Sequence, residues 1–169
     1  VMKHQGPGRL KDKAFIKATE KMDVVLTSYA LLNRDFDTLK QINWSNITLD
    51  EAQNIKNPST KQAQAARGIE ADQRMALTGT PVENRLTELW SIFQFLNPGY
   101  LGSQQNFRSR FSTPIERYGD EESAATLKQL TAPFILRRVK TDPKVIQDLP
   151  DKFENKVYCP LTSEQATLY

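Results

Sequence analysis

Residues 47–53 hold the feature that most constrains the fold: an apolar run that ends abruptly in two adjacent carboxylates, Asp50 and Glu51. Apolar runs of this kind are typical of strands that are buried in a parallel sheet. In open α/β sheets, ligands bind just beyond the carboxyl ends of such strands. The stretch therefore predicts an α/β fold with a polar site where this strand ends.

The two acids suit a site that holds a divalent metal ion and activates a water molecule. Mg²⁺ favours oxygen ligands, usually one or two carboxylates together with phosphates and water, so Asp50 is the candidate ligand. Glu51, one residue further on, is the candidate for the group that faces the attacking water. This is the form of a Walker B element, although an apolar run followed by Asp-Glu also occurs at ordinary strand ends.

Composition narrows the chemistry further. The 169 residues carry a net charge of +3, which is compatible with a nucleic-acid partner but does not require one. A single cysteine, Cys159, and a single histidine, His4, exclude an internal disulfide and a cysteine-based zinc site. No apolar run approaches a membrane span, and the first residues do not form a signal peptide. We therefore expect a soluble protein with no membrane partner, one compact domain or part of a larger one.

Strands and helices are expected to alternate along the chain, as in α/β proteins with a parallel sheet. The patterns predict helices over residues 9–21, 30–40, 58–68 and 81–96, and strands over residues 23–29, 47–53 and 73–80. Asn57 before Pro58 has the form of a helix cap, and the segment from Thr80 to Glu83 has the spacing of a capping box. The last of these helices carries one apolar stripe, Val82, Leu86, Leu89, Phe93 and Leu96.

The character of the sequence changes after residue 102. Residues 103–130 predict two short polar helices that stand off the sheet, with a cluster of acids at residues 120–122. Residues 133–136 and 156–159 read as strands, and residues 162–165 begin a further helix. Between them lies a basic cluster, Arg137, Arg138, Lys140 and Lys144.

Three pieces of sequence stand in an order that resembles one family. They are Val25-Leu26-Thr27-Ser28-Tyr29, then Leu49-Asp50-Glu51-Ala52-Gln53 with Ile55-Lys56-Asn57, then Leu77-Thr78-Gly79-Thr80-Pro81 with Glu83-Asn84 and Glu88-Leu89-Trp90. This order resembles the Swi/Snf-type ATPases of helicase superfamily two, the DNA-translocating motors related to chromatin remodellers. The likeness continues through Phe95-Leu96-Asn97-Pro98 and Phe134-Ile135-Leu136-Arg137-Arg138, and it covers nearly the whole chain.

The resemblance implies a RecA-like parallel sheet flanked by helices, without the phosphate-loop strand and with a small helical protrusion. It divides the chain into four parts. Residues 1–102 are a partial first RecA-like lobe with motifs Ib, II and III, and residues 103–132 are the protrusion. Residues 133–150 are the last strand and basic segment of the lobe, and residues 151–169 are the start of a linker to the second lobe.

In that family, the acidic pair is motif II. The resemblance implies that Asp50 positions Mg²⁺ on the phosphates of ATP and that Glu51 orients or deprotonates the hydrolytic water. Motif II commonly ends in histidine in this superfamily, and here it ends in Gln53. An amide can bridge two groups by hydrogen bonds but does not titrate near neutrality. Gln53 is therefore expected to couple the nucleotide site to its neighbours through hydrogen bonds, and not to relay protons.

Residues 77–81 resemble motif III, which links the phosphate site to the DNA path. Thr78 and Gly79 are the better candidates for coupling, because hydroxyls can exchange hydrogen-bond partners and glycine allows a close approach of the backbone. Thr80 shares that role or serves only as the helix cap.

Two groups of residues are expected to meet DNA. Thr27, Ser28 and Tyr29 match motif Ib and would contact the DNA backbone, which positions the protein without reading sequence; the alternative is an ordinary strand end. Lys56 and Asn57 lie near the same surface, although Asn57 could be only a cap. Arg137 and Arg138 match paired arginines of the family. Two roles are open for them: contact with DNA or phosphate, and a salt bridge between the two lobes.

The chain has no Gly-x-x-x-x-Gly-Lys-Thr sequence. The resemblance places that loop before residue 1 and the second RecA-like lobe after Tyr169. We therefore predict that these 169 residues belong to an ATP-dependent translocase that moves along double-stranded DNA and displaces bound proteins, and that alone they are inactive. The compartment is then the cytoplasm, at the nucleoid, in a prokaryote, or the nucleus in a eukaryote. The alternatives are a non-catalytic binding module with a degenerate helicase lobe and another superfamily-two helicase.

Overall fold

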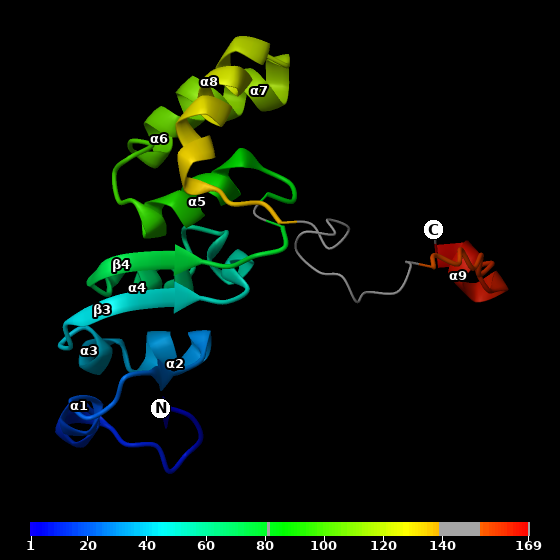
Figure 1. Ribbon diagram of the computed structural model, residues 1–169. Coiled ribbons are helices and arrows are strands. Elements are labelled where there is room, and N and C mark those ends of the chain that lie inside the picture. The colour runs from blue at the N-terminus through cyan, green and yellow to red at the C-terminus, as the bar shows by residue number, and fades with distance from the viewer. Residues whose placement is uncertain (81, 139–152, 169) are drawn as a thin grey trace. The chain divides into compact units, whose positions relative to one another are not determined.

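The computed structural model describes residues 1–80, 82–138 and 153–168, which fall into two compact units, Val1–Leu130 and Thr131–Tyr169 (Figure 1). In the first unit, strands alternate with helices, as the α/β prediction requires. Its first part contains β1 (Met2–Lys3), α1 (Asp12–Thr19), β2 (Val25–Leu26), α2 (Tyr29–Arg34), α3 (Phe36–Leu39), β3 (Trp44–Leu49), the 3₁₀ helix η1 (Ala52–Ile55), α4 (Lys61–Gly68), β4 (Ala71–Ala76) and α5 (Leu86–Leu96).

Strand pairing is parallel throughout the described residues. β1 pairs with β2. β3 and β4 run side by side (Figure 1), with Leu49 opposite Ala76 at the carboxyl end. Backbone bonds extend the second pair beyond the strands, because Leu77 N donates to Leu49 O (2.8 Å) and Ala52 N donates to Leu77 O (2.9 Å). Since parallel strands end at the same edge, the residues after β3 and those after β4 lie next to each other.

Helix α5 is shared by two apolar cores. One core lies between the strands β3 and β4 and the elements η1, α4 and α5: Leu49, Ala52, Ile55, Ala63, Ala66, Ile92 and Phe95. The other joins α5 to the helices that follow it: Leu89, Trp90, Phe93, Leu101, Phe107, Phe111 and Leu127. The prediction of a single stripe on this helix was therefore too narrow, because apolar residues lie on two of its sides.

Helix α4 begins three residues later than predicted. Thr60 is its N-cap, and its Oγ1 accepts the N–H of Ala63 (3.3 Å). The side chain of Asn57 instead accepts bonds from the backbone N–H (3.1 Å) and the hydroxyl (2.8 Å) of Ser59. An asparagine that closes a turn on the residue two positions later is not available to cap a helix. Gly68 ends the helix as predicted.

Helix α5 begins at Leu86, so the capping-box prediction at Thr80 was wrong; Pro81 itself lies outside the described residues. Thr80 Oγ1 donates to Glu83 Oε1 (3.2 Å) instead of accepting an amide of a helix. Glu88 Oε2, in the first turn of α5, accepts the N–H groups of Glu83 (2.8 Å) and Asn84 (3.2 Å). Glu88 thus binds the backbone that precedes the helix and keeps it in a loop.

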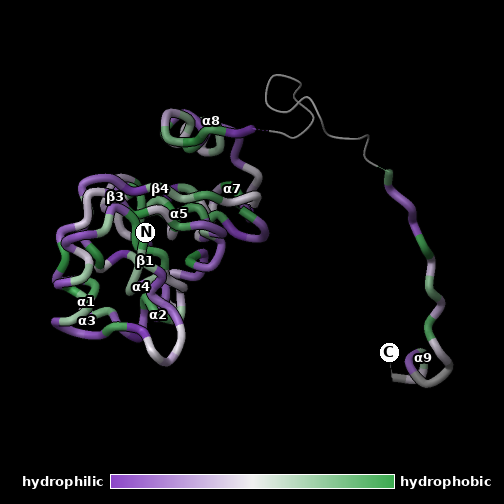
Figure 2. Tube along the Cα trace, turned by 60° about the horizontal axis from the view of Figure 1, so that its bottom comes forward, coloured by the Kyte–Doolittle hydropathy of each residue, from purple (hydrophilic) through white to green (hydrophobic). Residues whose placement is uncertain are grey.

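Residues 103–131 form the helical protrusion, and Figure 1 shows it beyond α5, away from β3 and β4. It consists of α6 (Gln104–Phe107), a π-helical turn η2 (Arg108–Ser112), α7 (Thr113–Tyr118) and α8 (Glu121–Thr131). The first three are continuous, so the prediction of two helices is confirmed. Hydrophilic and hydrophobic stretches alternate along α8 (Figure 2). Asp120 accepts bonds from the N–H (3.2 Å) and the hydroxyl (2.9 Å) of Ser123 and from the N–H of Glu122 (3.0 Å). These bonds lower the pKa of Asp120 and make it the cap of α8.

Two of the predicted strands are wrong. Residues 132–134 form the 3₁₀ turn η3 (Ala132–Phe134), and neither residues 135–138 nor residues 156–159 are strands. A strand requires a neighbour for its backbone groups, and the described part of the second unit supplies none. The helix predicted near residue 162 is confirmed as α9 (Ser163–Leu168). Lys140, Lys144 and the rest of residues 139–152 lie outside the described residues, so the boundary at residue 150 stays a prediction.

Among the residues that the structure describes, no helix has the length and apolar character that a membrane span requires.

Candidate active site

The candidate site lies where β3 and β4 end. Asp50 and Glu51 follow β3 and are exposed, and residues 77–80 follow β4 directly alongside. Among the described residues, no lysine, arginine or histidine forms an ion pair with either acid. The structure therefore places the acidic pair at the open edge of the strand pair, where the sequence predicted it.

Glu51 has a backbone conformation that is rare for a residue with a side chain. Its φ of 50° and ψ of 53° lie in the left-handed region, which costs on the order of 1 to 2 kcal/mol for residues other than glycine. The turn is held by a bond from Glu51 N–H to Asp50 Oδ1 (3.0 Å) and is continued by η1. Backbone strain of this kind is concentrated at functional sites.

A hydrogen-bonded relay joins Glu51 to the loop after β4. Gln53 Nε2 donates to Glu51 Oε2 (2.6 Å), and Thr78 Oγ1 donates to Gln53 Oε1 (2.8 Å). The N–H of Thr80 in turn donates to Thr78 Oγ1 (3.2 Å). Gln53 uses both ends of its amide, one as donor and one as acceptor, so one side chain connects the acid after β3 to the threonines after β4.

Gly79 lies inside this loop but makes no close approach to the described residues. A Cβ at this position would meet no other atom within 4 Å. The space around Gly79 is open, so the close approach that the sequence predicted is not made within the described residues.

Tyr29 lies against the acidic pair, a contact that the sequence did not predict. Its hydroxyl donates to the carbonyl oxygen of Asp50 (2.8 Å). Burial, followed by the negative charges of Asp50 and Glu51, raises the pKa of Tyr29 to about 12. A cleft of about 380 Å³ next to it is lined by β2, β3 and their following residues. Tyr29 thus links the predicted DNA-contact strand to the acids, and its partner is 21 residues away in sequence.

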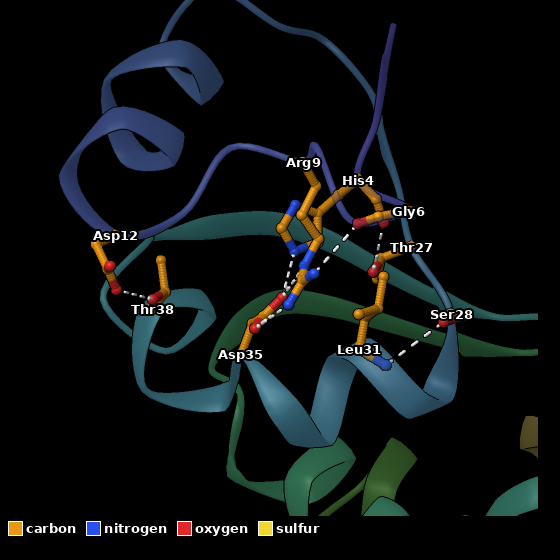
Figure 3. Close-up of polar contacts among 9 residues, drawn as sticks. All are labelled: His4, Gly6, Arg9, Asp12, Thr27, Ser28, Leu31, Asp35 and Thr38. Atoms are coloured by element: carbon orange, nitrogen blue, oxygen red, sulfur yellow. Dashed lines mark hydrogen bonds and ion pairs between the residues drawn. The ribbon is translucent and has the colours of Figure 1, made fainter.

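Thr27 and Ser28 are exposed, but their hydroxyls already have partners (Figure 3). Thr27 Oγ1 donates to the carbonyl oxygen of His4 (3.3 Å), and Ser28 Oγ accepts the N–H of Leu31 (3.4 Å) as the cap of α2. Both roles are those of an ordinary strand end and helix start. Their exposure leaves room for a ligand as well.

A buried ionic cluster fixes the residues beside Thr27 (Figure 3). Asp35 Oδ2 binds Arg9 Nε (2.6 Å) and His4 Nε2 (2.8 Å), and Asp35 Oδ1 binds Arg9 Nη2 (2.9 Å). The guanidinium of Arg9, more than the imidazole of His4, lowers the pKa of Asp35 to about 2. The chain's lone histidine is the one hint of this cluster in the sequence, but no local pattern pairs it with a residue 31 positions away.

Lys56 is near the site but is not a free cation. Its ammonium group binds the carboxylate of Glu83 and lies 4.0 Å from Glu88 Oε1. The bond to Glu83 raises the pKa of Lys56 and lowers that of Glu83. Asn57, the next residue, is exposed in its turn.

Arg137 and Arg138 belong to the second compact unit, and both are exposed. Their contact with DNA or with a second lobe stays a prediction.

The donor set at this edge suits a magnesium ion and does not suit zinc. The carboxylate of Asp50 offers oxygen atoms of the kind that Mg²⁺ prefers, while the carboxylate of Glu51 accepts a bond from Gln53. The part of the chain that the structure describes holds no cluster of three or more metal-ligating side chains. Mg²⁺ is commonly bound through one or two carboxylates, water and substrate phosphates, whereas a zinc site needs three or four protein ligands.

Parallel strands that carry an acidic pair at the end of one strand and a Thr-Gly-Thr loop at the end of the next define a RecA-like lobe of the kind found in nucleotide-driven helicases. Residues 1–169 match the SNF2-related domain family, and the chain belongs to this family.

Individual relatives agree. YwqA of Bacillus subtilis (strain 168), which is named as an ATP-dependent helicase/translocase, is 52% identical over 169 residues, which is 100% of this chain and 18% of YwqA. The TATA-binding protein-associated factor mot1 of Schizosaccharomyces pombe is 38% identical over 160 residues, 88% of this chain and 8% of mot1. The chain thus spans less than a fifth of each of these relatives.

Solved structures confirm the fold. The SWI2/SNF2 ATPase core of Sulfolobus solfataricus in complex with double-stranded DNA superposes with a TM-score of 0.71 at 53% identity, over 88% of this chain and 31% of that one. A second structure, the SWI2/SNF2 ATPase core domain of the same organism, gives a TM-score of 0.72 at 49% identity, over 99% of this chain and 34% of that one. The family resemblance and the RecA-like fold predicted from the sequence are both confirmed.

Proposed function

We propose that this chain is part of an ATP-driven motor that moves along double-stranded DNA and displaces proteins bound to it. The observation that carries the proposal is the relay from Glu51 through Gln53 to Thr78, because it ties a candidate hydrolytic carboxylate to the loop after the neighbouring strand. Membership of the SNF2-related domain family supports it.

The two acids have separate tasks in this proposal. Asp50 would hold Mg²⁺ through water, and the ion would supply positive charge against the phosphates of ATP. Glu51 orients the attacking water, and the bond from Gln53 fixes its carboxylate. Phosphoryl transfer depends mainly on positioning and charge stabilisation, which is what this pair offers.

The threonines after β4 report the state of the phosphates. When the γ-phosphate leaves, Glu51 loses the water that it held, and the amide of Gln53 and the hydroxyl of Thr78 are free to exchange partners. Gly79 allows the backbone between Thr78 and Thr80 to change its dihedral angles. A change at the nucleotide thereby becomes a change of the loop that precedes α5.

DNA is bound through its backbone in this proposal. Thr27 and Ser28 supply exposed hydroxyls, Tyr29 connects them to the acids, and Asn57 is exposed as well. Arg137 and Arg138, in the second compact unit, supply exposed cations for phosphates. Lys56 reaches the same surface with its charge already balanced by Glu83. Contacts of this kind give binding that depends on salt and not on sequence.

The whole protein, and not these 169 residues, carries the activity. The chain lacks the phosphate-loop sequence, and we propose that the second RecA-like lobe of the same protein completes the ATP site. The 169 residues alone are then inactive.

The test is an ATPase assay on the full-length protein, with and without duplex DNA. We expect duplex DNA to stimulate hydrolysis, and the Glu51→Gln variant to lower kcat by about 10² to 10³ while it still binds DNA. Glu20→Gln, an exposed acid after α1, is the control and retains activity. DNA-stimulated hydrolysis that survives Glu51→Gln would contradict the mechanism.

The same assay separates the alternatives. DNA binding without hydrolysis would identify a non-catalytic module, and separation of the duplex strands would identify another type of superfamily-two helicase.

A further inference from the structure

Three charged side chains meet beside the relay. Lys56 directly follows η1, Glu83 lies in the loop after β4, and Glu88 lies in the first turn of α5. The ammonium group of Lys56 binds Glu83 and lies 4.0 Å from Glu88 Oε1. Glu88 is the least exposed of the three, with 13% of its side chain accessible.

Hydrogen bonds connect this cluster to the relay without a gap. Thr80 N–H donates to Thr78 Oγ1 (3.2 Å), and Thr80 Oγ1 donates to Glu83 Oε1 (3.2 Å). Lys56 is also tied to the middle of the relay, because its N–H donates to the carbonyl oxygen of Gln53 (3.1 Å). The ion pair between Lys56 and Glu83 therefore closes a ring of contacts around the two loops of the site.

The cluster also controls the start of α5. Glu88 Oε2 accepts the N–H groups of Glu83 and Asn84, so one carboxylate holds the loop while its other oxygen faces Lys56. Without the lysine, the carboxylates of Glu83 and Glu88 would face each other as like charges. The loop would then separate from the first turn of the helix.

We propose that Lys56, Glu83 and Glu88 form a positioning cluster that transmits a change at Glu51 to helix α5, with Lys56 as its central charge and not as a contact to DNA. The proposal rests on the motor function proposed above. Helix α5 suits this role because it is shared by the core of the strands and the core of the protrusion. The protrusion also touches the start of the helix, since Leu86 N–H donates to Glu116 Oε1 on α7 (2.5 Å).

Partial exposure makes the proposal testable without unfolding the protein. Lys56 and Glu83 have 33% and 37% of their side chains accessible, and exposed ion pairs contribute little to the free energy of unfolding. Substitutions here are expected to leave the thermal midpoint near that of the wild type. A loss of function in these variants is then a loss of coupling.

The experiment uses four variants of the full-length protein: Lys56→Met, Glu83→Gln, the double variant, and the conservative variant Lys56→Arg, which keeps a positive charge between Glu83 and Glu88. Each is measured for kcat of ATP hydrolysis with saturating duplex DNA and for the Kd of duplex DNA over a series of salt concentrations. We expect Lys56→Met and Glu83→Gln each to lower the DNA-stimulated kcat by about 5- to 20-fold. The double variant is no worse than either single variant, and Lys56→Arg retains most of the wild-type kcat.

DNA affinity distinguishes the two roles of Lys56. A positioning residue leaves the Kd and its salt dependence at the wild-type values, whereas the loss of a phosphate contact weakens binding and lowers the salt slope by about one. Lys61→Met, an exposed lysine at the start of α4, is the matched control and retains the wild-type kcat.

Three results would overturn the proposal: weaker DNA binding by Lys56→Met with a reduced salt slope, an unchanged kcat in Glu83→Gln, or a kcat of Lys56→Arg as low as that of Lys56→Met. Failure of the proposed function looks different, because the wild-type protein itself would then show no DNA-stimulated hydrolysis.

Discussion

At the scale of single residues, partners far apart in sequence decide what each side chain can do. Tyr29 was expected to face DNA, and its hydroxyl binds the backbone of Asp50. Lys56 was expected to face phosphates, and its ammonium group binds Glu83. The contact of both residues with DNA stays a prediction, and in both cases the partner that the structure shows lies more than 20 residues away. Local patterns carry no information about such pairs.

Asp35 gives a prediction about pH. Its pKa is about 2 in the folded chain and about 3.9 in an unfolded one. A lowered pKa stabilises the fold above the unfolded value, and this contribution disappears as the pH falls from about 4 towards 2. Asp35→Asn is therefore expected to lower the free energy of unfolding at pH 7 by on the order of 2 kcal/mol.

Urea-induced unfolding of this chain, followed between pH 7 and pH 2.5, measures that difference. The gap between wild type and Asp35→Asn should shrink below pH 4. Asp37→Asn is the matched control, because Asp37 is exposed and pairs only with the nearby Lys40 in the described structure. A gap that stays constant with pH would contradict the assignment.

At the scale of elements, Arg74 joins β4 to the ends of two helices. Its Nη2 donates to the carbonyl oxygen of Ile69 after α4 (2.8 Å), and its Nη1 donates to that of Phe95 in α5 (2.9 Å). Carbonyl groups at the end of a helix lack partners within the helix, and a cation there also meets the negative end of the helix dipole. A single side chain thus serves both helices that cover the strands.

Arg74→Leu is expected to destabilise the contact between β4 and these helices by about 2 to 3 kcal/mol, because two carbonyl groups lose a charged donor. Hydrogen exchange of the amides of β4 and α5 in the full-length protein measures the effect. Gln73→Leu, the exposed neighbour on the same strand, should leave exchange unchanged. Equal protection of these amides from exchange in Arg74→Leu and wild type would contradict the prediction, because water would then replace the guanidinium without loss of stability.

At the scale of the whole molecule, the sequence predicted the order of elements and the place of the site but not the helix starts. The positions of Asp50, Glu51 and Thr78 just after strands could be predicted because an apolar run precedes each of them, while their roles stay predictions. The starts of α4 and α5 were missed because Asn57 and Thr80 each bind a neighbour other than a helix amide. The two strands predicted after residue 132 were wrong, since an apolar run does not show whether another strand is present to pair with it.

The activity of the 169 residues alone is the prediction at this scale. We expect no ATP hydrolysis above background from the isolated chain, because no phosphate-loop sequence is present to hold the β and γ phosphates. A malachite-green assay with and without duplex DNA, beside the full-length protein, measures this. Turnover by the isolated chain that matches the full-length protein would mean that the site is read wrongly.

Helix α5 has a practical consequence for anyone who builds chimaeras in this family. Its two apolar sides serve different neighbours: Ile92 and Phe95 pack with the strands, while Leu89, Trp90 and Phe93 pack with the protrusion. A protrusion transplanted from a relative at residues 103–131 alone would lack the α5 residues against which it packs in its own protein. The graft has to include the three outward residues of α5, and its junction therefore belongs inside that helix and not at the loop where the sequence changes character.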